Sequence, residues 1–151
     1  MGSIRVGSPA FGDHDEIPGR YTQTGENVSP PLEWSGLPDS ATELVLICED
    51  PDAPGGSPFL HWLVTGIDPG SAGVSEGQPP PGGREWPNGF GDAGWAGPQP
   101  PAGDPAHRYV FHLYALGQPI QLPDAPTAYD VHQHVDNAAV ASGSTVGMFQ
   151  R

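Results

Sequence analysis

Three apolar segments of the chain have the pattern of β-strands. Residues 44–48 form an unbroken apolar run with β-branched side chains, which is typical of a strand buried on both faces. In residues 59–64 and 107–116, neighbouring side chains should point to opposite faces, because a strand has a two-residue period. Strict alternation therefore assigns His61 and Trp62 to opposite faces of the predicted sheet.

Outside these segments the pattern predicts shorter elements. Thr127 and Asp130 fit a capping box, and apolar residues follow at helical spacing until Gly143, which predicts a helix of about four turns. Residues 145–150 predict a closing strand, and residues 3–11 predict an edge strand.

The composition favours a single ordered domain. At 151 residues the chain is long enough for one core, and we assign one domain to residues 1–151. Its 22 glycines and 20 prolines cluster between the patterned segments and predict turns and ordered loops. The chain starts without a basic and apolar leader, and no apolar run approaches the ~18 residues of a membrane span. We therefore expect a cytoplasmic protein without integral membrane contact.

The charge argues against several partners. The formal net charge is −13, from 18 acidic residues against five arginines and no lysine. Sequence-independent binding to nucleic acids depends on clustered cations, so we expect no nucleic-acid partner. Anionic membrane surfaces are disfavoured for the same reason. The single Cys48 lies inside an apolar run, which predicts a buried thiol rather than a nucleophile or a disulfide.

The candidate chemistry lies where the predicted strands begin or end. Asp50 and Asp52 follow the first apolar run, and the prolines beside them lack the backbone donors that a strand ladder needs. The strand should therefore stop near Asp50. His61 lies on the next strand, and His107 and Tyr109 leave one face at the start of theirs. If these side chains converge, two imidazoles and a phenol could hold a phosphate, sulfate or carboxylate, while an aspartate orients one imidazole.

Other interpretations of these residues stay open. They could bind a metal ion, but the tight ligand spacings of known motifs are missing, so we expect none. An Asp–His pair could serve a hydrolase, although the single Cys48 is expected to be buried and is therefore a poor candidate for a nucleophile. The residues could also only satisfy one another's hydrogen bonds. Elsewhere, His112 is expected to be structural, and His132 and His134 face different directions on a helix and cannot chelate one metal together.

Two longer motifs give the chain a specific resemblance. The first is DPDAP at residues 50–54, followed by His-Trp at 61–62, and the second is GPQPPAG at 97–103, leading to His-Arg-Tyr at 107–109. In this order they resemble the two signature segments of the phosphatidylethanolamine-binding protein family, which includes the Raf kinase inhibitor proteins. The resemblance spans nearly the whole chain and extends to the short bacterial and archaeal branch.

The resemblance implies a mainly β fold. A large antiparallel Greek-key sheet and a smaller sheet packed on it would form a β-sandwich, with few helices and with a helix and closing strand near the C-terminus. It also implies a small anion-binding cavity. Carried over by motif, the ligand-binding residues are Asp50, Pro54, Phe59, His61, Pro100, Pro101, His107 and Tyr109. Asp52, Arg108 and Gly97 would support the surrounding loops. The Ala53–Pro54 bond is expected to be cis.

By the same resemblance, we expect a non-enzymatic binding protein for a phosphate-like group, from a phospholipid head group or a phosphorylated small molecule. No catalytic residue and no cofactor are expected. Two alternatives are a hydrolase or isomerase that uses Asp50 and His107 as acid and base, and a protein-interaction module. The bacterial members suggest a homodimer. Gln99 stands where related proteins often have Gly or Cys, which leaves the ligand open.

Overall fold

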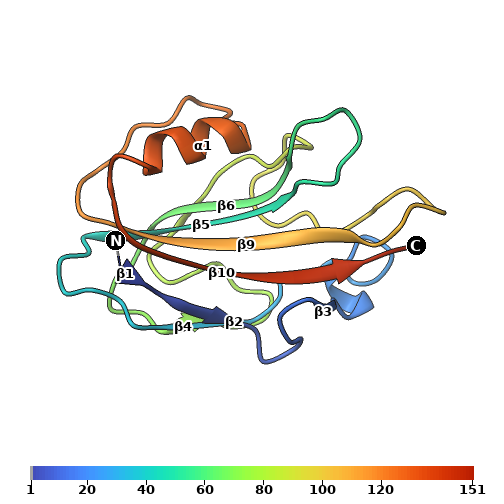
Figure 1. Ribbon diagram of the computed structural model, residues 1–151, viewed down its shortest axis with the longest axis horizontal. Coiled ribbons are helices and arrows are strands. Elements are labelled where there is room, and N and C mark those ends of the chain that lie inside the picture. The colour runs from blue at the N-terminus through green and yellow to red at the C-terminus, as the bar shows by residue number, and fades with distance from the viewer. Residues whose placement is uncertain (1) are drawn as a thin grey trace.

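The computed structural model describes residues 2–151 and shows a main β-sheet covered on both faces, by a helix on one side and a small sheet on the other (Figure 1). The main sheet has the strand order β1-β10-β9-β5-β6-β8, with β3 also paired to β10, and the small sheet has the order β2-β4-β7. The strands are β1 (Gly2–Ser3), β2 (Arg5–Gly7), β3 (Asp15–Glu16), β4 (Leu32–Ser35), β5 (Glu43–Asp50), β6 (Phe59–Ile67), β7 (Gly73–Val74), β8 (Arg84–Glu85), β9 (His107–Leu116) and β10 (Ala139–Phe149). The helices are the 3-10 turn η1 (Gly19–Tyr21) and α1 (Ala128–Val135).

The central strand β5 is buried on both faces, as its apolar run predicts. Leu44, Leu46 and Cys48 belong to the core between the two sheets. Val45 and Ile47 belong to a second core beneath α1. Strand β5 pairs antiparallel with both β6 and β9. The predicted mainly β architecture, with a smaller sheet packed on a larger one, is therefore confirmed.

The alternation predicted for β6 is wrong at one point. Along β5, successive residues pair with Trp62 and then with Leu60, so the register skips His61, which is the extra residue of a β-bulge. Trp62 packs in the core between the sheets, whereas Leu60 packs in the core beneath α1. The His61 ring lies edge-on to Tyr109 of β9, with the ring centroids 5.2 Å apart. The bulge thus lets His61 and Trp62 share a face, and it aims His61 at the start of β9.

The helix is shorter than the four turns predicted. Its capping box is present, but α1 ends at Val135, and β10 begins at Ala139. Gly143 therefore lies inside a strand rather than at a helix end. A Cβ atom on Gly143 would lie 2.0 Å from the Ile4 carbonyl oxygen, so this glycine is needed for the close approach of the N-terminal segment.

Two local expectations also fail. Residues 3–11 do not form one edge strand, because the segment divides between β1 in the main sheet and β2 in the small sheet. The Ala53–Pro54 bond is trans, as are the other peptide bonds of residues 2–151. The chain reverses instead at Gly55 and Gly56, whose φ angles of 100° and 80° are readily adopted only by glycine.

Candidate functional site

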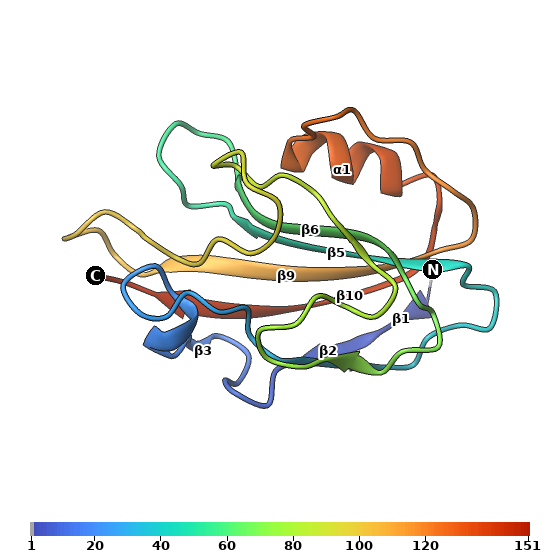
Figure 2. The same cartoon turned by 180° about the vertical axis from the view of Figure 1, so that it is seen from behind.

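Three neighbouring strands bring the candidate side chains to one end of the main sheet. Strand β5 ends at Asp50, β6 begins at Phe59, and β9 begins at His107. Because β5 runs antiparallel to both neighbours, these three termini meet at the same end. Figure 2 shows the loops before β6 and β9 extending past this end of the sheet, near the C-terminus.

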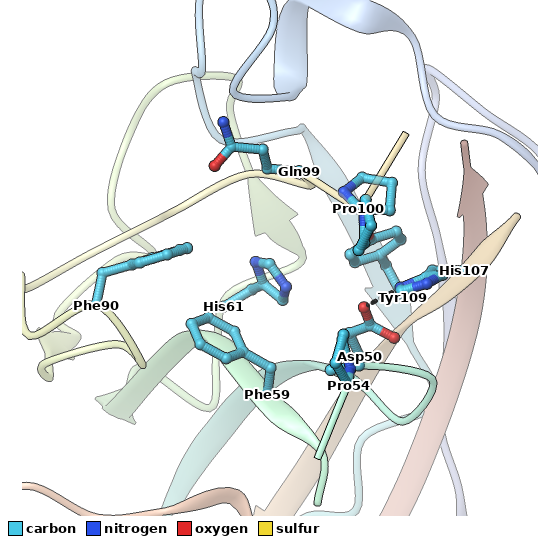
Figure 3. Close-up of a pocket in the computed structure, with 11 residues that line it drawn as sticks. Asp50, Pro54, Phe59, His61, Phe90, Gln99, Pro100, His107 and Tyr109 are labelled. Atoms are coloured by element: carbon cyan, nitrogen blue, oxygen red, sulfur yellow. Dashed lines mark hydrogen bonds and ion pairs between the residues drawn. The ribbon is translucent and has the colours of Figure 1, made fainter. Parts of the chain in front are cut away.

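A cavity of about 230 Å³ lies between these strand ends and the two loops. Figure 3 shows Asp50, His61 and Tyr109 converging on it, with Phe59 and Phe90 on one side and Pro100 on the other. The complete lining is Asp50, Ala53, Pro54, Phe59, His61, Phe90, Gln99, Pro100, Pro101, His107 and Tyr109. All eight residues expected at a ligand therefore surround one hollow, and their role in binding stays a prediction.

The lining also includes Phe90, which sequence reasoning did not place here. Its ring packs on Phe59 with centroids 4.7 Å apart, yet the residue is 52% exposed. The one available signal is an aromatic side chain within a Gly- and Pro-rich segment, which is costly to leave in water. Sequence reasoning also missed Asp104, a loop residue between the two parts of the second motif, residues 97–103 and 107–109.

The His107 imidazole lies between two carboxylates, and we call Asp50, His107 and Asp104 the pocket cluster. Nδ1 of His107 donates to Asp50 Oδ2 at 2.7 Å, and Nε2 donates to Asp104 Oδ2 at 3.1 Å. Burial lowers the pKa of His107, but the hydrogen bonds from Asp50 and Asp104 outweigh burial, so the pKa is raised. Because both nitrogens face carboxylate oxygens, this arrangement favours the imidazolium form of the ring.

His61 has one ring nitrogen fixed by the backbone and one left over. A carbonyl oxygen only accepts, so Nδ1 carries the proton and donates to the Ala96 oxygen at 2.6 Å. Burial lowers the pKa of His61, which favours the neutral ring with a lone pair on Nε2. No other residue of 2–151 bonds to Nε2.

The Tyr109 hydroxyl is the matching group across the cavity. Burial raises the pKa of this phenol above its ordinary value, so it stays protonated and can donate. No hydrogen bond to it occurs within the described part of the chain. Because no fully buried side-chain nitrogen or oxygen there lacks a partner, the Tyr109 hydroxyl and His61 Nε2 both have access to the hollow.

Asp52 and Arg108 lie outside the cavity and tie its loops together. Arg108 donates from Nη2 and Nε to the two carboxylate oxygens of Asp52 at 2.7 and 3.0 Å, and its backbone N–H adds a third bond at 2.8 Å. These bonds lower the pKa of Asp52 to about 2. The backbone N–H of Asp52 in turn donates to Asp50 Oδ1 at 2.8 Å. The ion pair thus holds the Asp50 carboxylate in place.

Gly97 allows the second loop to pack closely against the N-terminal segment. A Cβ atom there would lie 2.3 Å from the Tyr21 carbonyl oxygen. The Gly97 N–H also donates to Asn27 Oδ1 at 2.8 Å. Any larger residue would push this loop and its prolines away from the cavity.

The side chains that line the cavity suit ligand binding better than nucleophilic attack on a substrate. No serine, threonine or cysteine lines it. Cys48 is fully buried in β5, and burial raises the pKa of its thiol. Asp50 and His107 do form a buried acid–base pair, but the second nitrogen of His107 faces Asp104 rather than a free position.

The sequence profile of the family described as phosphatidylethanolamine-binding protein matches residues 7–150. The chain belongs to this family. A UPF0098 protein of Methanothermobacter thermautotrophicus, 40% identical over 147 residues, is matched over 94% of this chain and 95% of its own length. The Mycobacterium tuberculosis protein with the name "Putative lipoprotein LppC" is 44% identical over 147 residues, covering 97% of this chain and 72% of LppC.

Solved structures of phosphatidylethanolamine-binding protein homologues have the same fold. The Chlamydia trachomatis homologue CT736 superposes with a TM-score of 0.87 at 31% identity, over 100% of this chain and 99% of CT736. Escherichia coli YbcL, described as a new member of the mammalian phosphatidylethanolamine-binding protein family, superposes with a TM-score of 0.89 at 26% identity, over 99% of both chains. Among the described residues of the chain itself, no helix is long and apolar enough to cross a membrane.

Proposed function

We propose that the protein binds a small phosphate-like anion in the cavity at the end of the main sheet and does not transform it. The observation that carries this proposal is the pair of unpartnered polar groups, His61 Nε2 and the Tyr109 hydroxyl, at the base of a hollow walled by proline and phenylalanine. A hollow of about 230 Å³ takes a head group or a small phosphorylated compound, not a whole lipid.

The two groups select for a ligand that carries a proton. The Tyr109 hydroxyl donates, whereas Nε2 of neutral His61 accepts. A singly protonated phosphomonoester offers both an oxygen acceptor and a P–OH donor, so it satisfies both groups. The doubly ionised monoester that prevails at pH 8 fits only if His61 gains a proton instead. In either case binding of the monoester takes up a proton, and its affinity should rise as pH falls from 8 to 6.

The pocket cluster limits how tightly an anion binds. The imidazolium of His107 offsets the negative charge of Asp50, which otherwise would repel the ligand. Asp104, whose side chain is 41% exposed, adds a second carboxylate to the same ring. One buried cation shared between two anions leaves little positive field for a guest. We therefore expect a dissociation constant for inorganic phosphate of micromolar order or weaker.

Titration with phosphoethanolamine by calorimetry at pH 6 and pH 8 tests the proposal. Wild-type protein should bind this monoester more tightly at pH 6. The variant His61→Asn keeps an N–H donor for the Ala96 oxygen but removes Nε2, so it should lose about tenfold in affinity. Equal affinity at both pH values, or unchanged binding by His61→Asn, contradicts the proposal.

The buried pair of Asp50 and His107, whose Oδ2 and Nδ1 atoms lie 2.7 Å apart, favours a second candidate function, that of an enzyme. A hydrolase or isomerase would use these residues as base and acid. A panel of phosphoesters and carboxylic esters separates the two functions, because turnover that is abolished in His107→Ala cannot come from a passive binder. A third role, as a protein-interaction module, would show as pull-down of a partner that depends on a bound phosphate analogue.

Location and assembly belong to the same proposal. We place the protein in the cytoplasm, and cell fractionation tests this because LppC is named as a lipoprotein. We also propose a homodimer, which light scattering of the purified chain measures directly. A surface without lysine favours a soluble phosphorylated ligand at least as much as a bilayer.

A further inference from the structure

A second histidine–carboxylate group lies on the opposite face of the main sheet. Glu49 precedes Asp50 in β5, and because consecutive residues of a strand point to opposite faces, Glu49 points toward α1. His112 comes from β9 and His132 from α1. We call Glu49, His112 and His132 the helix cluster. It joins three elements whose residues are far apart in sequence.

The three side chains offer their donor atoms to one point. Glu49 Oε1 lies 3.1 Å from His112 Nε2 and also contacts His132 Nε2. One donor atom from each residue falls within 4.8 Å of the other two. The two imidazole rings stand nearly perpendicular, at 86°, with centroids 5.2 Å apart. The Nε2 atoms of His112 and His132 thus both face Glu49 Oε1.

We propose that Glu49, His112 and His132 form a binding site for a divalent first-row transition-metal ion. Two imidazole nitrogens and one carboxylate oxygen are a frequent donor set for Zn²⁺ and its neighbours in that row. Ligand atoms about 2.0–2.1 Å from a tetrahedral metal lie about 3.3 Å apart. The 3.1 Å separation of Glu49 and His112 is already close to this spacing, so small ring movements open the position.

The surroundings support the site in two ways. The Tyr114 hydroxyl oxygen lies 2.9 Å from His132 Nδ1, so it can accept a hydrogen bond from Nδ1–H. The lone pair of Nε2 is then available to coordinate a metal ion. The two histidine side chains are 27% and 30% exposed, whereas the Glu49 side chain is only 7% exposed. An ion can thus reach the nitrogens from solvent, and water can complete its coordination.

The alternative role of the helix cluster is a plain ion pair that fastens α1 to the sheet. An ion pair needs only one imidazole beside the Glu49 carboxylate. The second imidazole could then be replaced by any other polar group. The ion pair predicts no preference among cations. A metal site predicts saturable binding of Zn²⁺ and Co²⁺ but not of Mg²⁺ or Ca²⁺, which prefer oxygen ligands.

Titration of chelator-treated protein with Zn²⁺ at pH 7.5 tests the site. Calorimetry should show one ion per chain with a dissociation constant of roughly micromolar order or lower. His112→Ala and His132→Ala should each weaken binding at least about tenfold, and Tyr114→Phe should weaken it several-fold. His134→Ala is the matched control, because His134 lies on the same helix but, within residues 2–151, forms a side-chain hydrogen bond only with the Asp130 carbonyl oxygen. It should bind as the wild type does.

A spectroscopic measurement on the unaltered chain keeps the test independent of variant folding. Zn²⁺ should shift the side-chain resonances of His112 and His132 in NMR spectra and leave those of His61 and His107 in place. Co²⁺ should give the visible absorption of a four- or five-coordinate ion. The proposal is overturned if Zn²⁺ leaves the His112 and His132 resonances unmoved, or if the three variants bind it as tightly as His134→Ala.

Discussion

Glu49 and Asp50 are adjacent in β5, yet they support two clusters of opposite composition. In the pocket cluster, one imidazole lies between two carboxylates. In the helix cluster, one carboxylate lies between two imidazoles. The first opens into a hollow with apolar walls, and the second lies between the sheet and α1 with its two imidazoles partly exposed. The same residue types thus meet different surroundings within a single step along one strand.

The difference shows that the ratio of imidazoles to carboxylates, rather than the residue types alone, decides what a cluster can bind. The pocket cluster has its only imidazole occupied on both nitrogens, so a guest must be held by His61 and Tyr109 nearby. The helix cluster has a surplus of nitrogen donors around one oxygen. It therefore suits a cation that accepts lone pairs.

The largest expected difference is in stability. Glu49→Ala should lower the free energy of unfolding by about 2–3 kcal/mol, because the buried carboxylate accepts from two imidazoles and ties α1 to the sheet. Asp104→Ala, which removes an exposed member of the pocket cluster, should change it by less than about 0.5 kcal/mol. Urea denaturation at pH 6 with a chelator present measures both. Equal losses would mean that the two clusters contribute alike.

The stability that Glu49 of the helix cluster contributes should be lost at acidic pH. Burial raises the pKa of Glu49, but the hydrogen bonds from His112 and His132 outweigh it and lower the pKa to about 2. A carboxylate with a lowered pKa in the folded state contributes stability above its unfolded value, near 4.5, and this stability is lost as pH falls toward 2. The Glu49→Gln variant should show a shallower loss over that interval. If the free energy of unfolding of Glu49→Gln falls as steeply with pH as that of the wild type, Glu49 does not contribute to acid unfolding.

Removing one hydroxyl should affect the cavity without affecting the fold. Tyr109→Phe should weaken phosphate binding by about ten- to a hundredfold, the value of a hydrogen bond to a charged group. The free energy of unfolding should stay the same, since no described residue bonds to this hydroxyl. Tyr129→Phe, at an exposed position of α1, is the matched control. Full binding by Tyr109→Phe would exclude the hydroxyl from the site.

Alkaline pH should weaken both clusters, and one variant separates them. The hydrogen bond with Glu49 raises the pKa of His132. Its stabilising effect is present below the ordinary value of 6.5 and is lost as pH rises through the raised one. Wild-type stability should fall as pH rises above 6.5. His132→Gln should show a smaller fall, because the contribution of His132 is absent. An identical fall in both proteins would contradict this assignment.

The smallest effect concerns charge at the cavity. Asp104→Asn removes one negative charge near His107 and should strengthen phosphate binding about two- to fivefold at pH 6, where Asp50 still keeps His107 charged. The effect should shrink as salt rises, because Asp104 is partly exposed. Titration of the variant at low and high ionic strength measures both. Weaker binding by Asp104→Asn would mean that this carboxylate positions the ligand instead of opposing it.

Sequence reasoning succeeded where a strand has a plain two-residue period. The bounds predicted for β9 match the structure, and the run that predicted β5 lies inside that strand. It failed at His61, because a single bulged residue reverses the faces of all residues beyond it and leaves no mark in the pattern. It also failed at Gly143, since a glycine needed for close packing and a glycine that ends a helix look identical in a sequence.

The candidate site divides in the same way. The motifs at residues 50–54 and 97–103 placed the cavity walls correctly around one hollow. The helix cluster escaped notice because Glu49, His112 and His132 share no local spacing, and only the pairing of β5 with β9 and the docking of α1 bring them together. His132 was compared with His134, its neighbour in sequence, although its actual neighbour is His112.

The most direct test of the central claim follows the His61 imidazole while phosphate is added. In long-range ¹H–¹⁵N NMR spectra of the wild-type protein at pH 6, phosphate should shift the Nε2 resonance of His61 from that of a lone-pair acceptor toward that of a hydrogen-bonded or protonated nitrogen. The resonances of His112 and His132 should not move. A His61 Nε2 resonance that stays in place at saturating phosphate would contradict the account.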